Sequence, residues 1–454
     1  MRFPVHRQIV ISSLLLLGGL MGPAGAAGQT PADGPPDAGG EVSLAACLRI
    51  GLSQNPALAA AREGIRIAGE EAGMARAAYY PDVRLEGGYR RWQSHAFIPE
   101  IPVPGLPSTI GPIDDWSVRL RASYLLYDGG ERAARYRGAL AAAAAAGEDT
   151  RQLRQDLALA IHQAFYALTA ADEARAAAQQ QLARTRNNLR LTEVRLAAGA
   201  VSKADVLRAR VEAADAELAL VRVANLVEMR RADLNRTLGL PVETPLIIDP
   251  LVDDPAAPTK EEVSAAMDRA ARQRPSILAL RQRLEAGGQE VRAARSRYYP
   301  RFSLDGYAGW RDEEWAPEDA DWSVGLSFSL PLFQGFSRRH ELGRARAEQD
   351  RLAALLREAR QQVRQDVWDA HLRIGEAREA VTAAAVLVAD AAESLRLVQA
   401  RYEAGAGTVN DLLDVQAALA RAEAIQVEAR MNLRQAQATF RWSTTDLLPE
   451  ELDH

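Results

Sequence analysis

The chain has 454 residues, of which 48% are hydrophobic and 25% charged, and its formal net charge is −5. A mildly acidic chain of this length can bury more than one core, and it lacks the basic surface that nucleic acid requires. Its mean hydropathy is −0.21, and no apolar stretch is long enough for a helical membrane span, so any membrane insertion must use strands.

The N-terminus is predicted to be a signal peptide covering residues 1–26. Arg2 and Arg7 precede an apolar stretch from Ile9 to Met21, and Ala24-Gly25-Ala26 has the small-x-small pattern of a signal peptidase site. Residues 27–42 follow as a predicted flexible segment. The protein is therefore expected to be exported.

The rest of the chain contains one structural unit twice, predicted at 43–240 and 260–446. Tyr79-Tyr80-Pro81 recurs as Tyr298-Tyr299-Pro300, and Asp115-Trp116-Ser117-Val118 recurs later as Asp321-Trp322-Ser323-Val324. A duplication of this length predicts two copies of one supersecondary unit. Residues 241–259 are expected to link the copies, and residues 447–454 form a short tail.

Cys47 is the only cysteine, so it cannot form an intramolecular disulfide or a cysteine metal cluster. Leu44-Ala45-Ala46-Cys47 resembles a lipoprotein processing site, but a Pro/Gly-rich segment at 30–40 separates it from the apolar stretch of the signal. Cys47 corresponds to Met267 in the second copy. We therefore expect a buried helical position rather than a lipid anchor.

Each copy is predicted to run from two helices through two strands into two long helices. Tyr-Tyr-Pro ends a helix, because proline disfavours helical geometry in the residue before it. Alternation of apolar and polar residues then predicts strands at about 82–92 and 116–127, and at about 301–310 and 322–332. In the last of these, Val324 and Leu326 alternate with Ser323, Gly325 and Ser327, so one face is apolar and the other polar.

Aromatic residues are predicted to form a belt at each end of these strands. They are Trp92, Trp116, Trp310 and Trp322 at the hairpin turns, and Tyr79, Tyr80, Tyr127, Tyr298, Tyr299 and Phe333 at the opposite ends. Alternation alone would also fit a soluble β-sandwich, but two such belts favour a transmembrane β-barrel. Four strands cannot close a barrel, and an open edge cannot face lipid, so the barrel must close between subunits.

The segments after each strand pair are predicted to be very long helices. A helix from Gly130 to Ala198 would be about 100 Å long at 1.5 Å per residue. In the second copy Val363, Ala370 and Ala377 are spaced by seven, which indicates a left-handed supercoil. Each long helix is expected to end at a glycine and return, over about 203–238 and 408–441, as an antiparallel hairpin.

Together these features resemble the TolC-like outer membrane efflux proteins. The resemblance covers essentially the whole mature chain and includes the two hairpin turns. These turns are Arg195-x-x-x-Gly199-x-x-Ser202-x-x-Asp205-x-Leu207 and Arg401-x-x-x-Gly405-x-x-Thr408-x-x-Asp411-x-Leu413.

The resemblance implies an α+β membrane protein that forms a homotrimer in the outer membrane of a Gram-negative bacterium. Three chains would each give four strands to a 12-stranded β-barrel, continued by an α-helical coiled-coil barrel in the periplasm. It implies the exit duct of a tripartite efflux pump, with an inner-membrane pump and a periplasmic adaptor as partners. A type I secretion channel is an alternative, and a non-conducting periplasmic coiled-coil protein is an alternative of another class.

The resemblance also implies which residues constrict the pore. Asp411-Leu412-Leu413-Asp414 matches the family motif for acidic rings, which select for cations, and its two carboxylates lie one turn apart on one helix face. Asp411 could instead be a helix-start carboxylate favoured by the helix dipole, as could Asp205. Family members commonly carry an arginine where this chain has Gly407, which leaves Tyr402 as the candidate element of a closed-state latch.

Adaptor docking is expected at the two hairpin tips. The candidate residues are Gly199, Val201, Ser202, Lys203, Gly405, Gly407 and Thr408. The six histidines lie far apart without metal-ligand spacing, and no nucleophile or phosphate-loop motif is present. We therefore expect no enzyme activity, no cofactor and no metal site.

Overall fold

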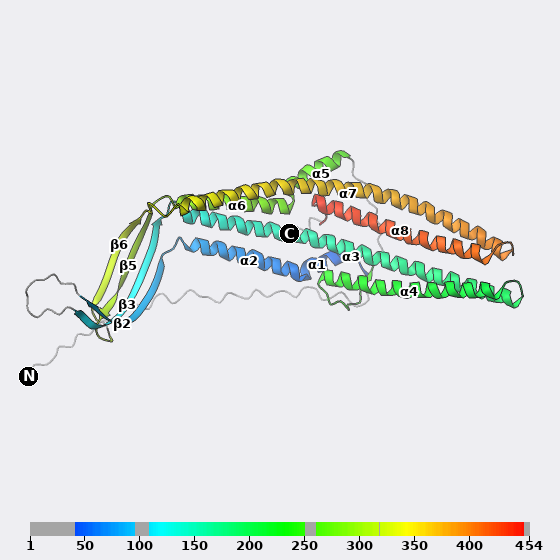
Figure 1. Cartoon of the computed structure of the whole chain (residues 1–454), viewed down its shortest axis with the longest axis horizontal. Helices are drawn as coiled ribbons and strands as arrows, with labels where there is room; N and C mark the ends of the chain where they lie inside the picture. Colours follow the sequence, from blue (N-terminus) through cyan, green and yellow to red (C-terminus); the bar gives the residue numbers. More distant parts are fainter. Residues whose placement is uncertain (1–40, 96–108, 250–259, 317, 449–454) are drawn as a thin grey trace, which may run out of the picture.

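The computed structural model describes residues 41–95, 109–249, 260–316 and 318–448. The molecule is elongated, with a β-sheet at one end and two helical hairpins that reach the other end (Figure 1). The predicted signal peptide, nearly all of segment 27–42, part of the linker and most of the tail lie outside the described residues.

The described elements fall into two runs of the same order and similar length. The first run comprises α1 (Leu44–Gln54), α2 (Pro56–Ala77), β2 (Asp82–His95), β3 (Thr109–Tyr127), α3 (Glu131–Ala197) and α4 (Lys203–Leu238). The second run comprises α5 (Lys260–Gln273), α6 (Pro275–Ser296), β5 (Arg301–Asp312), β6 (Ala320–Ser329), α7 (Ser337–Glu403) and α8 (Val409–Thr444). Helices α3 and α7 each have 67 residues, and α4 and α8 each have 36.

Local sequence explains where these helices begin. Pro56 and Pro275 occupy the first turns of α2 and α6, where the missing N–H of proline leaves no helical hydrogen bond unmade. The Asn55 side chain accepts a hydrogen bond from the Ala57 N–H at 2.8 Å and caps α2. The paired prolines therefore fix equivalent helix starts in the two halves.

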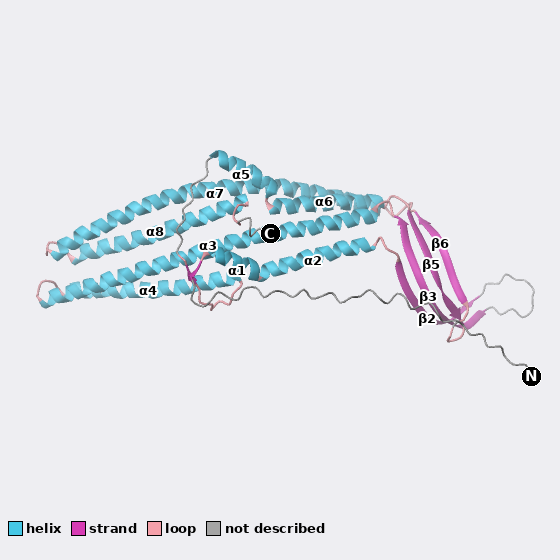
Figure 2. Ribbon diagram, turned by 180° about the vertical axis from the view of Figure 1, so that it is seen from behind, coloured by secondary structure: helices cyan, strands magenta, loops and turns pink. Residues whose placement is uncertain are grey.

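The helices form a layer that continues from the sheet. Next to the sheet the neighbours run α2, α3, α6, α7, and toward the hairpin tips they run α4, α3, α8, α7 (Figure 2). Short strands β1 (Glu41–Val42) and β4 (Ile247–Ile248) pair in parallel beside the middle of the layer. The long helices α3 and α7 thus span both halves of the helical part.

The main hydrophobic core lies where α1 packs against the middle of α3 and the end of α4. It contains Leu52, Phe165 and Leu234. Cys47 belongs to this core and has no exposed surface, and burial raises the pKa of its thiol to about 12. Cys47 is therefore a packing residue, and a lipid-bearing thiol does not fit this position.

The sheet is antiparallel with the strand order β2-β3-β5-β6, so β2 and β6 are its edges within the described chain. Three strand ends differ from the predicted bounds by three residues or more, and one of them is β2, which ends at His95 rather than near 92. β3 begins at Thr109 rather than near 116, and β6 ends at Ser329 rather than near 332. The β2–β3 register shifts between Trp92 and Ser94, beside Gly111 and Pro112, which interrupts the alternation and conceals the outer part of this hairpin from sequence analysis.

Candidate functional site

Both hairpin tips lie at the end of the molecule farthest from the sheet (Figure 1). Gly199 and Gly405 end the α3 and α7 turns with φ of 72° and 77°, a left-handed conformation that glycine adopts without strain. Three residues later Ser202 and Thr408 cap α4 and α8. Asp205 and Asp411 therefore occupy equivalent positions in the first turns of α4 and α8.

Asp411 is part of a capping box at the start of α8. Its carboxylate accepts hydrogen bonds from the Thr408 N–H at 3.1 Å and from the Thr408 hydroxyl at 2.7 Å, while its own N–H donates to that hydroxyl oxygen at 3.2 Å. Asp205 makes the same contacts with Ser202 at 3.0, 2.7 and 3.3 Å. Both carboxylates thus have a structural role, and a pore role for either would be additional.

These hydrogen bonds also hold the two carboxylates in the ionised form. The side-chain and backbone donors of Thr408 lower the pKa of Asp411, and those of Ser202 lower the pKa of Asp205. Donors to a carboxylate favour its charged state. Negative charge therefore stays at both tips well into the acidic range.

Asp414 is exposed and has no capping role. It lines a groove of about 570 Å³ between α4 and α8, together with Leu207, Val211 and Leu413. Across this groove the Arg208 guanidinium donates to the Asn410 side chain at 3.0 Å. Arg208 thereby links the two hairpins, a contact that sequence analysis did not predict.

Tyr402, the predicted latch element, is only 2% exposed and lies between α7 and α3. Its hydroxyl is 3.4 Å from the Thr192 hydroxyl. The Arg195 guanidinium lies 4.2 Å from the Tyr402 ring centroid and donates to the Glu403 carbonyl at 3.0 Å. We call Thr192, Arg195 and Tyr402 the tip cluster, which joins the first hairpin to the second.

Gly407 fits closely beside this cluster. A Cβ atom at position 407 would lie 3.1 Å from the Tyr402 backbone nitrogen. Any side chain there would therefore press on the backbone of Tyr402. Farther from the tips, Arg184 of α3 forms an ion pair with Glu423 of α8 at 2.9 Å.

The predicted docking residues all lie at the tips. Ser202, Lys203 and Thr408 are exposed, as are the two turn glycines, whereas Val201 and Gly407 are half-buried. A partner that approached the tips would meet these residues first. Their role in docking stays a prediction.

Most of the predicted aromatic belt residues are exposed around the sheet. These are Tyr79, Tyr80, Tyr127, Tyr298, Tyr299, Trp310, Trp322 and Phe333. Trp116 is half-buried. Its ring centroid lies 4.2 Å from that of Tyr89 in a tilted contact and 4.7 Å from that of Trp315 in an edge-to-face contact. It lies inside β3 rather than at a hairpin turn.

Trp92 lies on the opposite face of the sheet from Trp116. In the β2–β3 register Arg90 pairs with Asp115, while Tyr89 pairs with Trp116. Residues two apart share a face of a strand, so Trp92 lies on the face of Arg90, whose guanidinium is 5.9 Å from its ring centroid. Trp92 therefore lies on the polar face and Trp116 on the apolar face, and the place of Trp92 in an aromatic belt stays a prediction.

The chain matches the family model described as "Outer membrane efflux protein" over residues 48–240 and 266–444. It belongs to the outer membrane efflux protein family. The family confirms the predicted resemblance and the predicted location in the outer membrane, with a large helical part in the periplasm. Members of this family are channels rather than enzymes, and none of the described helices combines the length and apolarity of a membrane span.

Individual relatives agree with this assignment of the efflux protein. It is 30% identical to Protein CyaE of Bordetella pertussis over 402 residues, which cover 87% of this chain and 82% of the relative. It is 33% identical to outer membrane protein OprJ of Pseudomonas aeruginosa over 147 residues, which cover 32% of this chain and 31% of the relative.

Solved structures share its fold. The outer-membrane channel OprN matches with a TM-score of 0.75 and 23% identity, covering 88% of this chain and 89% of that chain. The CmeC outer membrane channel of Campylobacter jejuni matches with a TM-score of 0.78 and 16% identity, covering 90% of this chain and 86% of that chain. The mostly helical chain with one four-stranded sheet is thus the fold of known outer membrane channels.

Proposed function

We propose that three copies of this protein form the exit duct of a tripartite efflux pump. The duct conducts substrates passively across periplasm and outer membrane after an inner-membrane transporter and a periplasmic adaptor deliver them. The observation that carries this proposal is a four-stranded sheet with two open edges and two chemically different faces.

The apolar face suits contact with lipid. It includes Leu85, Val324 and Phe328, and Leu326 is 68% exposed, although such side chains are usually buried in a water-soluble protein. The opposite face carries Arg121, Asp305 and Ser327, which lie on the same side of the sheet in three different strands. In a closed barrel the first face meets lipid and the second lines a water-filled lumen.

The open edges require partner strands. Backbone N–H and C=O groups of β2 and β6 would be unpaired in hydrocarbon, where each such group costs several kcal/mol. Pairing β6 of one copy with β2 of the next removes both edges. Three copies give 12 strands, enough for a barrel with an aqueous interior.

The helical layer also has two free sides with exposed apolar residues. Val211, Val221 and Met229 are exposed on α4, and Leu372 and Val386 are exposed on α7. α4 and α7 are the outer helices of the layer toward the tips, so neighbouring copies would bury these residues together. The same ring of copies would then close both the sheet and the helical layer.

The duct proposal is tested by recording single-channel currents from the purified full-length protein in planar bilayers. Stable conductance steps are expected from the wild type. Absence of conductance in the wild type and in a variant with loosened tips, Arg195→Ala, would overturn the duct proposal.

The partners are tested separately by co-purification from cross-linked cells. Recovery of an inner-membrane transporter and a periplasmic adaptor is expected. Recovery with an exported polypeptide instead would favour the type I secretion channel. A non-conducting coiled-coil protein would give neither conductance nor these partners.

A further inference from the structure

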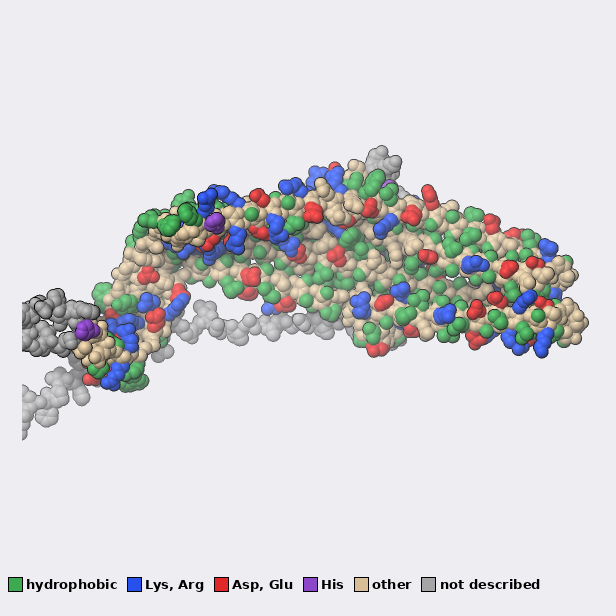
Figure 3. Space-filling view, viewed as in Figure 1, with side chains coloured by type: hydrophobic (Ala, Val, Ile, Leu, Met, Phe, Trp, Pro, Cys, Tyr) green, Lys and Arg blue, Asp and Glu red, His purple; other side chains and the backbone are tan. Residues whose placement is uncertain are grey.

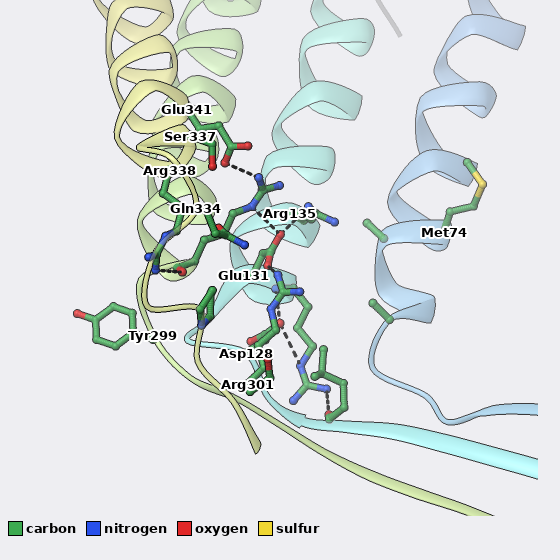
Figure 4. A pocket seen from close by; sticks show the side chains of 17 residues that line it. Met74, Asp128, Glu131, Arg135, Tyr299, Arg301, Gln334, Ser337, Arg338 and Glu341 are labelled. Atoms are coloured by element: carbon green, nitrogen blue, oxygen red, sulfur yellow. Dashed lines mark hydrogen bonds and ion pairs between the residues drawn. The ribbon is translucent and has the colours of Figure 1, made fainter. Parts of the chain in front are cut away.

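We propose that the protein binds organic anions in a cavity where the sheet meets the helices. This cavity, here called the junction cavity, has a volume of about 840 Å³ and lies between the ends of α2, β3 and β6 and the starts of β5, α3 and α7 (Figure 4). Its ligand would carry a carboxylate, phosphate or sulfonate group beside an apolar body. The inference rests on the proposed function in one respect, that the polar face of the sheet lines the duct.

The strand residues of the junction cavity place its opening on that polar face. Arg301 and Ser329 line the cavity and are register partners in neighbouring strands. Two residues farther along, Ser303 and Ser327 are also partners, and their hydroxyl oxygens lie 2.6 Å apart. Because residues two apart share a face, the cavity is continuous with the polar face and not with the apolar one.

The cavity carries a surplus of positive charge. Five arginines and three carboxylates line it, a net charge of +2 for each chain. Lys and Arg side chains are gathered where the helices meet the sheet (Figure 3). Glu131, which is 5% exposed, is the shared partner of Arg135 at 2.5 Å, Arg297 at 3.5 Å and Arg301. One buried carboxylate therefore holds three guanidinium groups close together.

A fourth guanidinium is held by carbonyl groups rather than by a carboxylate. Arg338 donates to the Leu332 carbonyl at 3.1 Å and to the Arg297 carbonyl at 3.4 Å, and it lies 5.1 Å from the Tyr298 ring centroid. Carbonyl oxygens orient a guanidinium without neutralising it. Arg338 thus presents a fixed and uncompensated charge.

Arg132 is held in the same way. It donates to the Leu125 carbonyl at 2.5 Å and to the Leu126 carbonyl at 2.9 Å. The nearby Asp128 carboxylate, 4.0 Å from Arg132 Nε, accepts hydrogen bonds from the Gly130 and Arg132 N–H groups. Asp128 is therefore committed to the start of α3, which leaves the charge of Arg132 only partly balanced.

The lining identifies the chemistry of the ligand. Guanidinium groups in fixed orientations match the paired oxygens of carboxylate, phosphate and sulfonate groups. Met74 and Ala75 of α2, with Ala78 directly after it, line the other side and provide an apolar wall. An anion with an apolar body can contact both sides at once, whereas an inorganic cation would be repelled.

The test uses naphthalene-1,5-disulfonate, which stays anionic at all relevant pH values, and the full-length protein in lipid nanodiscs. Isothermal titration is expected to detect binding that weakens with salt. Replacing two cavity arginines, Arg135→Gln with Arg338→Gln, should raise the dissociation constant about tenfold. The matched control, Arg339→Gln with Arg344→Gln, removes the same charge from exposed positions of α7 outside the cavity and should leave it unchanged.

Arg338→Gln alone is the second variant, because it breaks no ion pair with a carboxylate and preserves the partners of Glu131. Wild-type protein that binds no disulfonate, or a cavity variant that binds as tightly as its control, would overturn the proposal. Nanodiscs of phosphatidylcholine alone, compared with nanodiscs containing phosphatidylglycerol, separate the two sources of anion. Binding in both supports a soluble anion, and loss with phosphatidylglycerol supports a lipid headgroup in the same cavity.

Single-channel recording separates this inference from the proposed function. The same disulfonate should reduce the current through wild-type channels and less so through the cavity variant. Channels that conduct normally without binding or block would refute the junction cavity as an anion site and leave the duct intact. Binding without any conductance would refute the duct and leave the anion site intact.

Discussion

Replacing Arg195 by alanine is expected to loosen the hairpin tips. Arg195 contacts the Tyr402 ring at 4.2 Å and donates to the Glu403 carbonyl at 3.0 Å. A cation–π contact at such a site stabilises by about 0.5–1 kcal/mol, and a hydrogen bond by about 0.5–1.5 kcal/mol. Together they amount to about 1–2.5 kcal/mol per chain, which corresponds to about a five- to seventyfold change in an equilibrium constant.

This change should appear as a greater open fraction in single-channel recordings. Arg195→Lys keeps the positive charge but loses the planar guanidinium, which contacts the ring and donates in a fixed direction. Its open fraction should therefore lie between those of the wild type and Arg195→Ala. Arg190→Ala is the matched control, because Arg190 lies on the same helix and donates to Asn187 within α3. If Arg195→Ala and Arg190→Ala gave the same open fraction as the wild type, the tip cluster would not hold the hairpins together.

Three further predictions test the tips and the sheet. Asp414→Asn should lower the cation selectivity, measured as a shift of the reversal potential, without lowering the unfolding temperature. Asp411→Ala should lower both the cation selectivity and the unfolding temperature, since Asp411 also caps α8. Unchanged reversal potentials would contradict the acidic ring. The pKa of Asp411 is lowered in the folded state. Its carboxylate should therefore stabilise the protein fully at pH values above the ordinary aspartate pKa of about 3.8, and this stabilisation should be lost as the pH falls through the lowered pKa. Thr408→Val should therefore lower the unfolding temperature at pH 7, and by less once the pH is below the lowered pKa of Asp411, where only the hydrogen bond from the Asp411 N–H to the hydroxyl remains to be lost. An equal effect at both pH values would refute the contribution of the carboxylate to the cap. Leu326→Arg places a charge on the apolar face, which costs about 2–4 kcal/mol in lipid, so this variant should insert less into the membrane. Ser327→Arg, on the polar face, should insert normally and lower the conductance. Equal insertion of both variants would contradict the assignment of the faces.

Sequence analysis predicted the parts of the molecule that are encoded locally. The Tyr-Tyr-Pro junctions lie between helix and strand in both halves, because proline acts on the residue directly before it. Gly199 and Gly405 have the left-handed backbone that was expected at a helix end. The period-two pattern also identified the two faces of the strands, since burial on one side of a sheet repeats every second residue.

Contacts between distant segments could not be predicted in this way. Arg195 and Glu403 are 208 residues apart in sequence, and Glu131 and Arg301 are 170 residues apart. Arg195 belongs to a hairpin-turn motif, but nothing in the local sequence indicates which distant residue any of these four contacts. Only the packing of α3 against the second half brings these side chains together, so the tip cluster and the junction cavity become visible in three dimensions alone.

The closure of one barrel by three chains is the central claim, and the mass of the purified protein in detergent tests it most directly. Native mass spectrometry should find a particle of three chains that persists after the detergent is stripped in the gas phase, because each chain has two open sheet edges to satisfy. A particle of one, two or four chains would contradict the account.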